Sequence, residues 1–137
     1  MLINFFTEKM SKAKILIVED DNMLCTVFEM FLEELGYEHC GTVASGEDAL
    51  THLENKQPNL ILMDIHLKGE IDGIETAKLI LEKYDIPIIY ISGDSDVNTA
   101  IRAVLKNTYG FMTKPVYKDS LELNIEFALH KHNLNNN

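Results

Sequence analysis

Five side chains that could take part in chemistry stand directly after a short apolar run in the sequence, or one residue further on. They are three carboxylates, a hydroxyl and an ammonium group: Glu19, Asp64 and Ser92 directly follow such a run, and Asp20 and Lys114 stand one residue further on. If the apolar runs are parallel strands of one sheet, their carboxyl ends lie along a single edge, which is where open α/β sheets bind ligands. We therefore expect these five side chains to converge on one crevice.

Three carboxylates in one crevice repel one another unless a cation lies among them. Magnesium suits such a place, because Mg²⁺ takes oxygen ligands and commonly uses one or two carboxylates together with a phosphate; Mn²⁺ could replace it. Zinc would prefer histidine or cysteine ligands. The only histidine close to an expected strand end is His66, two residues past Asp64.

A lysine and a hydroxyl around a metal-bound carboxylate are the groups that phosphoryl transfer to an aspartate requires. The Lys114 ammonium group can pair with a phosphoryl oxygen, and the Ser92 hydroxyl can donate to the same group. Asp64 would then be the nucleophile. Taken singly, these residues also have ordinary explanations: Asp64 could merely cap a turn, and Asp21 could be a helix N-terminal residue favoured by the helix dipole.

The apolar pattern predicts an α/β domain, a doubly wound parallel sheet of five strands with five helices. The unbroken apolar run over residues 60–63 is typical of a strand buried on both faces in the middle of a parallel sheet. The other strands are expected over 15–18, 37–43, 88–91 and 109–113, and the helices over 23–35, 47–55, 74–84, 97–105 and about 118–130. Alternating strands and helices with right-handed crossovers give a flavodoxin-like sheet, with the strand order second, first, third, fourth, fifth.

Length and charge limit the classes of protein to which the chain can belong. With 137 residues it is long enough for one domain with a proper core. A count of 22 acidic against 12 basic residues gives a formal net charge of -10, which argues against a nucleic-acid-binding surface. Neither a membrane span nor a secretory signal is recognisable. We therefore expect a cytoplasmic protein that binds neither nucleic acid nor membrane.

Three segments are expected along the chain: a leader or extension over residues 1–12, the domain itself over 13–131, and a polar tail over 132–137. The two cysteines, Cys25 and Cys40, show neither C-x-x-C nor metal-ligand spacing. Buried free thiols in a reducing cytoplasm are therefore expected.

The motifs at the expected strand ends resemble those of the receiver domain of two-component response regulators, of the single-domain, chemotaxis-regulator-like type. The resemblance covers nearly the whole chain, from Lys14 to about His130. The motifs that carry it stand in the family's order and at nearly its spacing: Ile17-Val18-Glu19-Asp20, Leu62-Met63-Asp64, Asp72-Gly73, Ile91-Ser92 and Lys114-Pro115. Two departures are a loop after Asp64 that is one residue longer than usual, and Gly93 where alanine is commoner.

The resemblance implies roles for the acidic residues. Asp64 would be the phosphoacceptor, phosphorylated by a histidine kinase or a histidine phosphotransfer protein. Glu19, Asp20 and Asp64, together with the backbone carbonyl of His66, would hold the metal ion. His66 and Asp94 occupy the two positions that tune the lifetime of the acyl phosphate in this family, and we expect them to face each other across the site.

The resemblance also implies a switch. Ser92 would be the switch hydroxyl, Lys114 would contact the phosphoryl group, and Phe111 would be the aromatic residue that rotates inward. The bond between Lys114 and Pro115 would be cis, a form that bonds before proline tolerate far better than others.

By the same resemblance, phosphorylation would change the surface formed by the expected fourth helix, fifth strand and fifth helix. A downstream protein, a fused output domain or a second copy, giving a homodimer, would dock there. The domain would act in a phosphorelay as a signalling phosphoprotein rather than as an enzyme, although autophosphorylation and autodephosphorylation are intrinsic to it. Since no output domain is recognisable after His130, we expect a stand-alone messenger or relay, or a receiver cut from a longer regulator.

Three other interpretations compete with a working receiver. A haloacid dehalogenase-type phosphatase also forms an aspartyl phosphate, but its nucleophile would be on the first strand and a second Asp would stand where His66 does. A nucleotide-binding fold would need a phosphate-binding glycine loop after the first strand, where the acidic residues stand. A degenerate receiver that binds partners without phosphorylation is the more serious rival, and the presence of every required residue argues against it.

Overall fold

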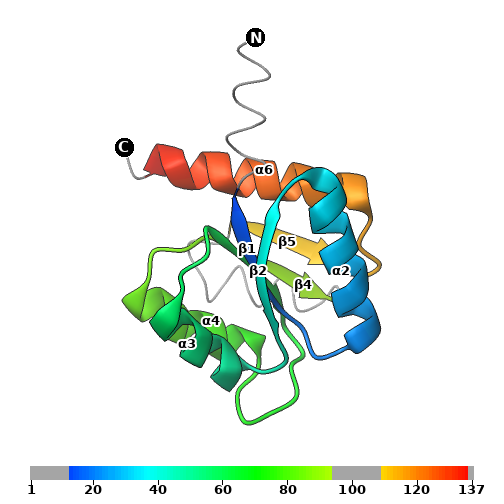
Figure 1. The fold of residues 1–137 in the computed structure, drawn as a ribbon. Helices are drawn as coiled ribbons and strands as arrows, with labels where there is room; N and C mark the ends of the chain where they lie inside the picture. Colours follow the sequence, from blue (N-terminus) through cyan, green and yellow to red (C-terminus); the bar gives the residue numbers. More distant parts are fainter. Residues whose placement is uncertain (1–12, 94–108, 136–137) are drawn as a thin grey trace.

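The computed structural model describes residues 13–93 and 109–135, and these form one five-stranded sheet with helices on both faces (Figure 1). The strands are β1 (Lys14–Val18), β2 (Glu38–Val43), β3 (Leu60–Asp64), β4 (Ile88–Ser92) and β5 (Gly110–Thr113). Neighbouring strands are all parallel, in the order β2-β1-β3-β4-β5. The doubly wound, flavodoxin-like fold predicted from the sequence is therefore confirmed.

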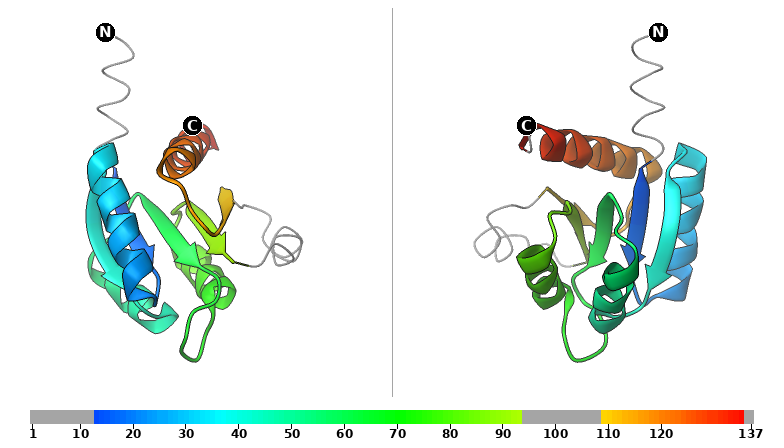
Figure 2. Two further views of the ribbon diagram at one scale, coloured as in Figure 1. Left: turned by 90° about the vertical axis from the view of Figure 1, so that its right-hand side faces the viewer. Right: turned by 60° about the vertical axis from the view of Figure 1, so that its left-hand side comes forward.

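Four helices cover the sheet in the described residues: α2 (Asn22–Leu35), α3 (Gly46–Asn55), α4 (Gly73–Lys83) and α6 (Lys118–Asn135). The helices α2 and α6 lie on one face, and α3 and α4 lie on the other (Figure 2). The fourth of the five predicted helices, over 97–105, and the predicted leader, over 1–12, fall outside the described residues. Of the helices that are described, none is long and apolar enough to span a membrane.

The core consists of two apolar layers, because successive side chains of a strand point to opposite faces of the sheet. In β1, Ile15 and Ile17 belong to the layer beneath α2 and α6, whereas Leu16 and Val18 belong to the layer beneath α3 and α4. All residues of β3 and β4 are buried, which explains why their sequences are continuous apolar runs. Only the last residue of each of these two strands is polar.

The helix α2 begins directly after the acids of β1 because Asp21 caps it. Asp21 Oδ1 accepts hydrogen bonds from the backbone N–H groups of Met23, at 2.9 Å, and Leu24, at 3.2 Å. The helix ends at Leu35 and is capped by Gly36, whose φ of 86° lies in the left-handed region that favours glycine. Asp21 therefore has the ordinary structural role that the sequence allowed for it.

The helix α6 is longer than predicted. Residues 132–137 were expected to form a polar tail, but the helix continues to Asn135. Its last turns contact residues distant in the sequence: His132 Nε2 lies 3.1 Å from Asp85 Oδ1, and Asn135 Nδ2 donates to the Tyr109 hydroxyl at 3.2 Å. Polar residues thus continue the helix because other elements supply their partners.

Both cysteines are free, as expected. Cys25 is buried in α2, whereas Cys40 is only partly buried, which corrects the expectation of two buried thiols. Cys40 lies in β2, an edge strand whose residues are all at least partly exposed.

Gly73 begins α4 at a point where the chain passes very close to β3. A Cβ atom added there would lie 2.0 Å from the backbone carbonyl oxygen of Asp64. Gly73→Ala is therefore expected to lower the free energy of unfolding, measured by urea denaturation, by about 2 kcal/mol or more. Gly93→Ala is the control: an added Cβ there meets no described atom within 4 Å, and the change should stay below about 0.5 kcal/mol. Equal losses in the two variants would contradict this account.

Candidate functional site

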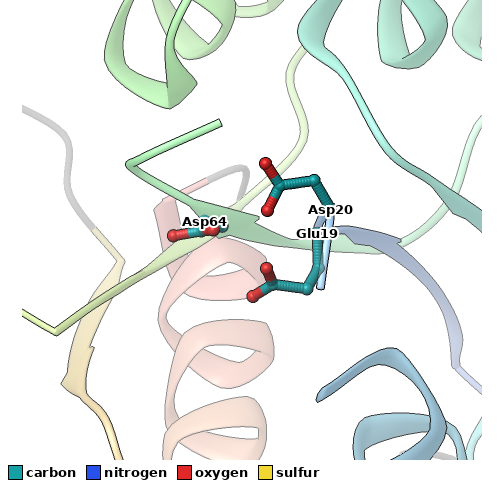
Figure 3. A group of neighbouring side chains, drawn as sticks. All are labelled: Glu19, Asp20 and Asp64. Carbon is teal, nitrogen blue, oxygen red and sulfur yellow. The ribbon is translucent and has the colours of Figure 1, made fainter. Parts of the chain in front are cut away.

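The predicted acidic residues meet at the carboxyl ends of β1 and β3 (Figure 3). Val18 pairs with Met63 in the sheet, so the residues that follow them, Glu19 and Asp64, stand side by side. Glu19, Asp20 and Asp64 each offer a carboxylate oxygen, and these oxygens lie within 4.8 Å of one another. Glu19 and Asp64 are almost completely buried, and Asp20 is partly exposed. The three acids therefore converge as the sequence analysis expected.

Lys114 brings a positive charge to this cluster. Its Nζ atom lies 3.3 Å from Glu19 Oε1 and 3.6 Å from Asp64 Oδ1. The backbone N–H of Lys114 donates to the carbonyl oxygen of Ser92 at 2.8 Å, which ties the end of β5 to the end of β4. The peptide bond between Lys114 and Pro115 is cis, as the resemblance implied. The lysine side chain thus reaches from β5, past β4, to acids on β1 and β3.

Ser92 and Phe111 lie on the two strands beyond the acids. Ser92 is the last residue of β4 and is completely buried, one residue past Ile91, which pairs with Asp64 of β3. Phe111, in β5, pairs with Tyr90 and packs, partly buried, against the layer beneath α3 and α4. The hydroxyl and the aromatic ring therefore belong to adjacent strands, and their roles in switching stay predictions.

The charge on Glu19 is disfavoured in this site. The pKa of Glu19 is raised to about 7, first by burial and then by the neighbouring Asp64 carboxylate. The Asp21 backbone N–H and the Lys114 ammonium group act in the opposite direction. Glu19 Oε1 is buried and, among the described residues, accepts no hydrogen bond, although Lys114 Nζ lies 3.3 Å away as an ion-pair partner.

The oxygen atoms that this cluster offers as metal ligands suit a hard cation. They are all carboxylate oxygens, which is the ligand type that Mg²⁺ takes. Among the described residues, the ion pairs of these three carboxylates all come from Lys114, which contacts Glu19 and Asp64, so this part of the chain leaves the cluster short of positive charge. The buried Oε1 of Glu19 lies near Lys114 Nζ but accepts no hydrogen bond among the described residues, so it can take a further ligand. These residues therefore fit a divalent cation.

The loop that joins β3 to α4 is hydrogen-bonded to two of the acids. The backbone N–H of His66 donates to Asp64 Oδ1 at 3.2 Å, and that of Lys68 donates to Asp20 Oδ2 at 2.9 Å. His66 itself is exposed, and its backbone carbonyl stays a predicted metal ligand. Asp94, its predicted counterpart across the site, lies outside the described residues.

Two residues near the site gave no signal in the sequence. The Cys25 thiol donates to the backbone carbonyl of Glu19 at 3.2 Å, and burial raises the pKa of this thiol to about 11. Glu47, in the first turn of α3, accepts hydrogen bonds from the N–H groups of Glu70 and Ile71, in the loop after β3. All three partners are backbone groups, which leave no trace in a pattern of side chains.

Known proteins resemble this chain both in sequence and in structure. The response regulator receiver domain matches residues 15–126. The chain is 34% identical over 117 residues to the nitrogen assimilation regulatory protein NtrX of Azorhizobium caulinodans, and 31% identical over 124 residues to the heme response regulator HssR of Staphylococcus saprophyticus. These matches cover 84% and 89% of the chain, but only 26% and 54% of the relatives. The chain therefore spans only part of the length of these curated relatives.

Solved structures give the same picture. The signal receiver domain of a modulated diguanylate cyclase from Desulfovibrio desulfuricans superposes with a TM-score of 0.83 at 38% identity, covering 90% of this chain and 98% of that one. The N-terminal domain of a response regulator/sensory box/GGDEF 3-domain protein from Carboxydothermus hydrogenoformans gives a TM-score of 0.81 at 31% identity, covering 90% and 99%. Nearly the whole of each of these two domains is thus matched.

The crowded carboxylates predict that a divalent cation stabilises the fold. Mg²⁺ at about one hundred times its dissociation constant should raise the free energy of unfolding by about 2.7 kcal/mol, because it binds the folded state alone. The effect is measured as a rise in melting temperature against a potassium salt of equal ionic strength. Asp20→Asn should lose most of the rise, whereas Asp48→Asn, which changes an exposed acid of α3, should keep it. Equal rises in the two variants would place the cation elsewhere.

Proposed function

The chain belongs to the receiver domains of two-component response regulators, and on that premise we propose that phosphorylation of Asp64 switches it between two conformations. The main support is the convergence of Asp64 with Lys114 and two further acids at one end of the sheet. We propose that it works as a phosphoprotein switch and not as an enzyme acting on other molecules.

The proposed phosphoryl donor is a phosphohistidine of a histidine kinase or a histidine phosphotransfer protein. A carboxylate oxygen of Asp64 attacks the phosphorus atom, so that a phosphorus–oxygen bond forms while the phosphorus–nitrogen bond to the histidine breaks. The imidazole leaves as a neutral ring once it has taken a proton from water. The product is an acyl phosphate on Asp64, which water later hydrolyses to the free carboxylate and inorganic phosphate.

The chain's own charges are placed to favour this transfer. Lys114 Nζ lies 3.6 Å from Asp64 Oδ1, so its charge stands beside the atoms that carry the transferred group. The lysine side chain is 26% exposed, so the site opens to solvent on this side, where a donor can approach. Mg²⁺, or Mn²⁺ in its place, held by Glu19, Asp20 and Asp64, would neutralise charge on the phosphoryl oxygens.

Ser92 and Phe111 are proposed to carry the signal away from the site. Phosphoryl oxygens bonded by Ser92 and Lys114 favour the conformation in which Phe111 turns inward, and the shift is limited by the difference in interaction energy between the two conformations. The backbone bond from Lys114 to Ser92 joins the ends of β4 and β5. A movement of Ser92 is therefore passed directly to the strand that carries Phe111.

The proposed output surface combines the segment 94–108, outside the described residues, with β5 and α6. On α6, Leu123, Phe127 and Leu134 are large apolar side chains that are each more than half exposed and recur at helical spacing. This face supports docking of a downstream protein, a fused output domain or a second copy, in a cytoplasmic setting. The net charge of -10 disfavours nucleic acid as the ligand of this domain.

Incubation with acetyl phosphate and Mg²⁺, followed by intact-mass spectrometry, tests the proposal. The wild-type protein should gain the mass of one phosphoryl group, and Asp64→Asn should gain none, because an amide is not a nucleophile here. Asp48→Asn, which replaces an exposed acid of α3, should still gain one phosphoryl group. If the wild type stays unmodified with acetyl phosphate and with a phosphohistidine donor, the protein is a degenerate receiver that binds partners without phosphorylation.

A further inference from the structure

The loop over residues 65–72 is held by side chains at both of its ends. Near its start, two backbone N–H groups donate to the site carboxylates of Asp20 and Asp64, at 2.9 and 3.2 Å. Near its end, the N–H groups of Glu70 and Ile71 both donate to Oε1 of Glu47, each at 3.2 Å. Glu47 belongs to α3 and is not part of the acidic cluster. The loop therefore connects Glu47 mechanically to the acids.

The start of α3 is closely fitted to this loop. Gly69 has a φ of 120°, in the region that favours glycine, and a Cβ added there would lie 3.1 Å from Glu47 Oε2. A Cβ added at Gly46 would lie 2.0 Å from Thr76 Oγ1 and 2.8 Å from Ile71 Cγ1. The backbone before Glu47 thus packs directly against the loop and α4, which holds the carboxylate beside the loop's N–H groups.

The ionisation of Glu47 agrees with this geometry. Its pKa is lowered, because its own backbone N–H and then the N–H groups of Ile71 and Glu70 donate to the carboxylate. An ionised acceptor forms the stronger hydrogen bonds. Glu47 is nevertheless exposed, so water screens its charge, and the placement of its oxygen matters more than the charge itself.

We propose that Glu47 is a positioning residue for the acidic site: it fixes the loop over residues 65–72, and through the loop it orients Asp20 and Asp64. This inference rests on the proposed function and adds to its site a residue that supports the metal-binding acids. Without Glu47, two N–H groups lose their acceptor, and the N–H groups that orient the site acids are held less firmly. Mg²⁺ binding then weakens, and water reaches the acyl phosphate more readily.

Three variants of the full chain, titrated with Mg²⁺ and followed by NMR, test the role of Glu47. Glu47→Ala removes the acceptor and is expected to weaken Mg²⁺ binding about tenfold or more. Glu47→Gln keeps an oxygen that can accept both N–H groups, and its affinity should stay within about threefold of the wild type. Asp48→Ala removes an exposed charge from the same first turn of α3 and should bind Mg²⁺ like the wild type.

Two further measurements separate positioning from a loss of stability. Amide hydrogen exchange at Glu70 and Ile71 should be faster in Glu47→Ala than in the wild type. In Glu47→Gln, the exchange rates of these two amides should return to the wild-type values. The acyl phosphate of Glu47→Ala should hydrolyse several-fold faster. Since Glu47 is exposed, Glu47→Ala should keep the melting temperature close to that of the wild type.

Three results would overturn the positioning role. These are an Mg²⁺ affinity of Glu47→Ala that equals the wild type, an equal weakening in Asp48→Ala, and an equal weakening in Glu47→Gln. Failure of the proposed function gives a different result. Suppose that the three variants bind Mg²⁺ as expected but that Asp64 of the wild type accepts no phosphoryl group. The positioning role of Glu47 would then be supported, and the proposed phosphorylation of Asp64 would be wrong.

Discussion

The fold holds two carboxylates against each other in a place that water barely reaches. Glu19 is 2% and Asp64 is 3% exposed, and like charges this close in the protein interior repel strongly. Lys114 offsets part of the repulsion, and the pKa of Glu19 is still raised, first by burial and then by the neighbouring Asp64 carboxylate. Because the described residues do not balance the charge of the site, a cation or a phosphoryl group that enters it is expected to change the interaction energies of the neighbouring groups.

The sheet holds the acids together against this repulsion because the strands that precede them are largely buried and paired with each other. Every residue of β3 is buried, and its register with β1 sets Glu19 beside Asp64. The segments that follow β3 and β5 contact the acids directly. The loop after β3 is held by backbone N–H groups donating to Asp20, Asp64 and Glu47, and Lys114 is tied to β4 by one backbone bond. Changes of charge at the acids are therefore expected to act on these segments first.

Much of this arrangement could be predicted from the sequence, because one local pattern indicated both the strands and the site residues. An apolar run that stops at a polar residue indicates a buried strand and also shows which side chain stands at its carboxyl end. In this way the strands β1, β3 and β4 and the residues Glu19, Asp64 and Ser92 were predicted together. The parallel topology then placed these residues at one edge, because strand ends of a parallel sheet meet there.

The sequence by itself thus determined the fold and the composition of the acidic cluster, since both follow from local periodicity and a regular topology. The tertiary structure decided the contacts that join distant segments. Glu47 meets the backbone of a loop more than twenty residues away, and the last turns of α6 depend on the contact of His132 with Asp85. The hydroxyl of Tyr37 donates to Glu126 from the opposite half of the chain. Such contacts depend on where packing brings each backbone and side chain, and residue type alone does not encode that placement.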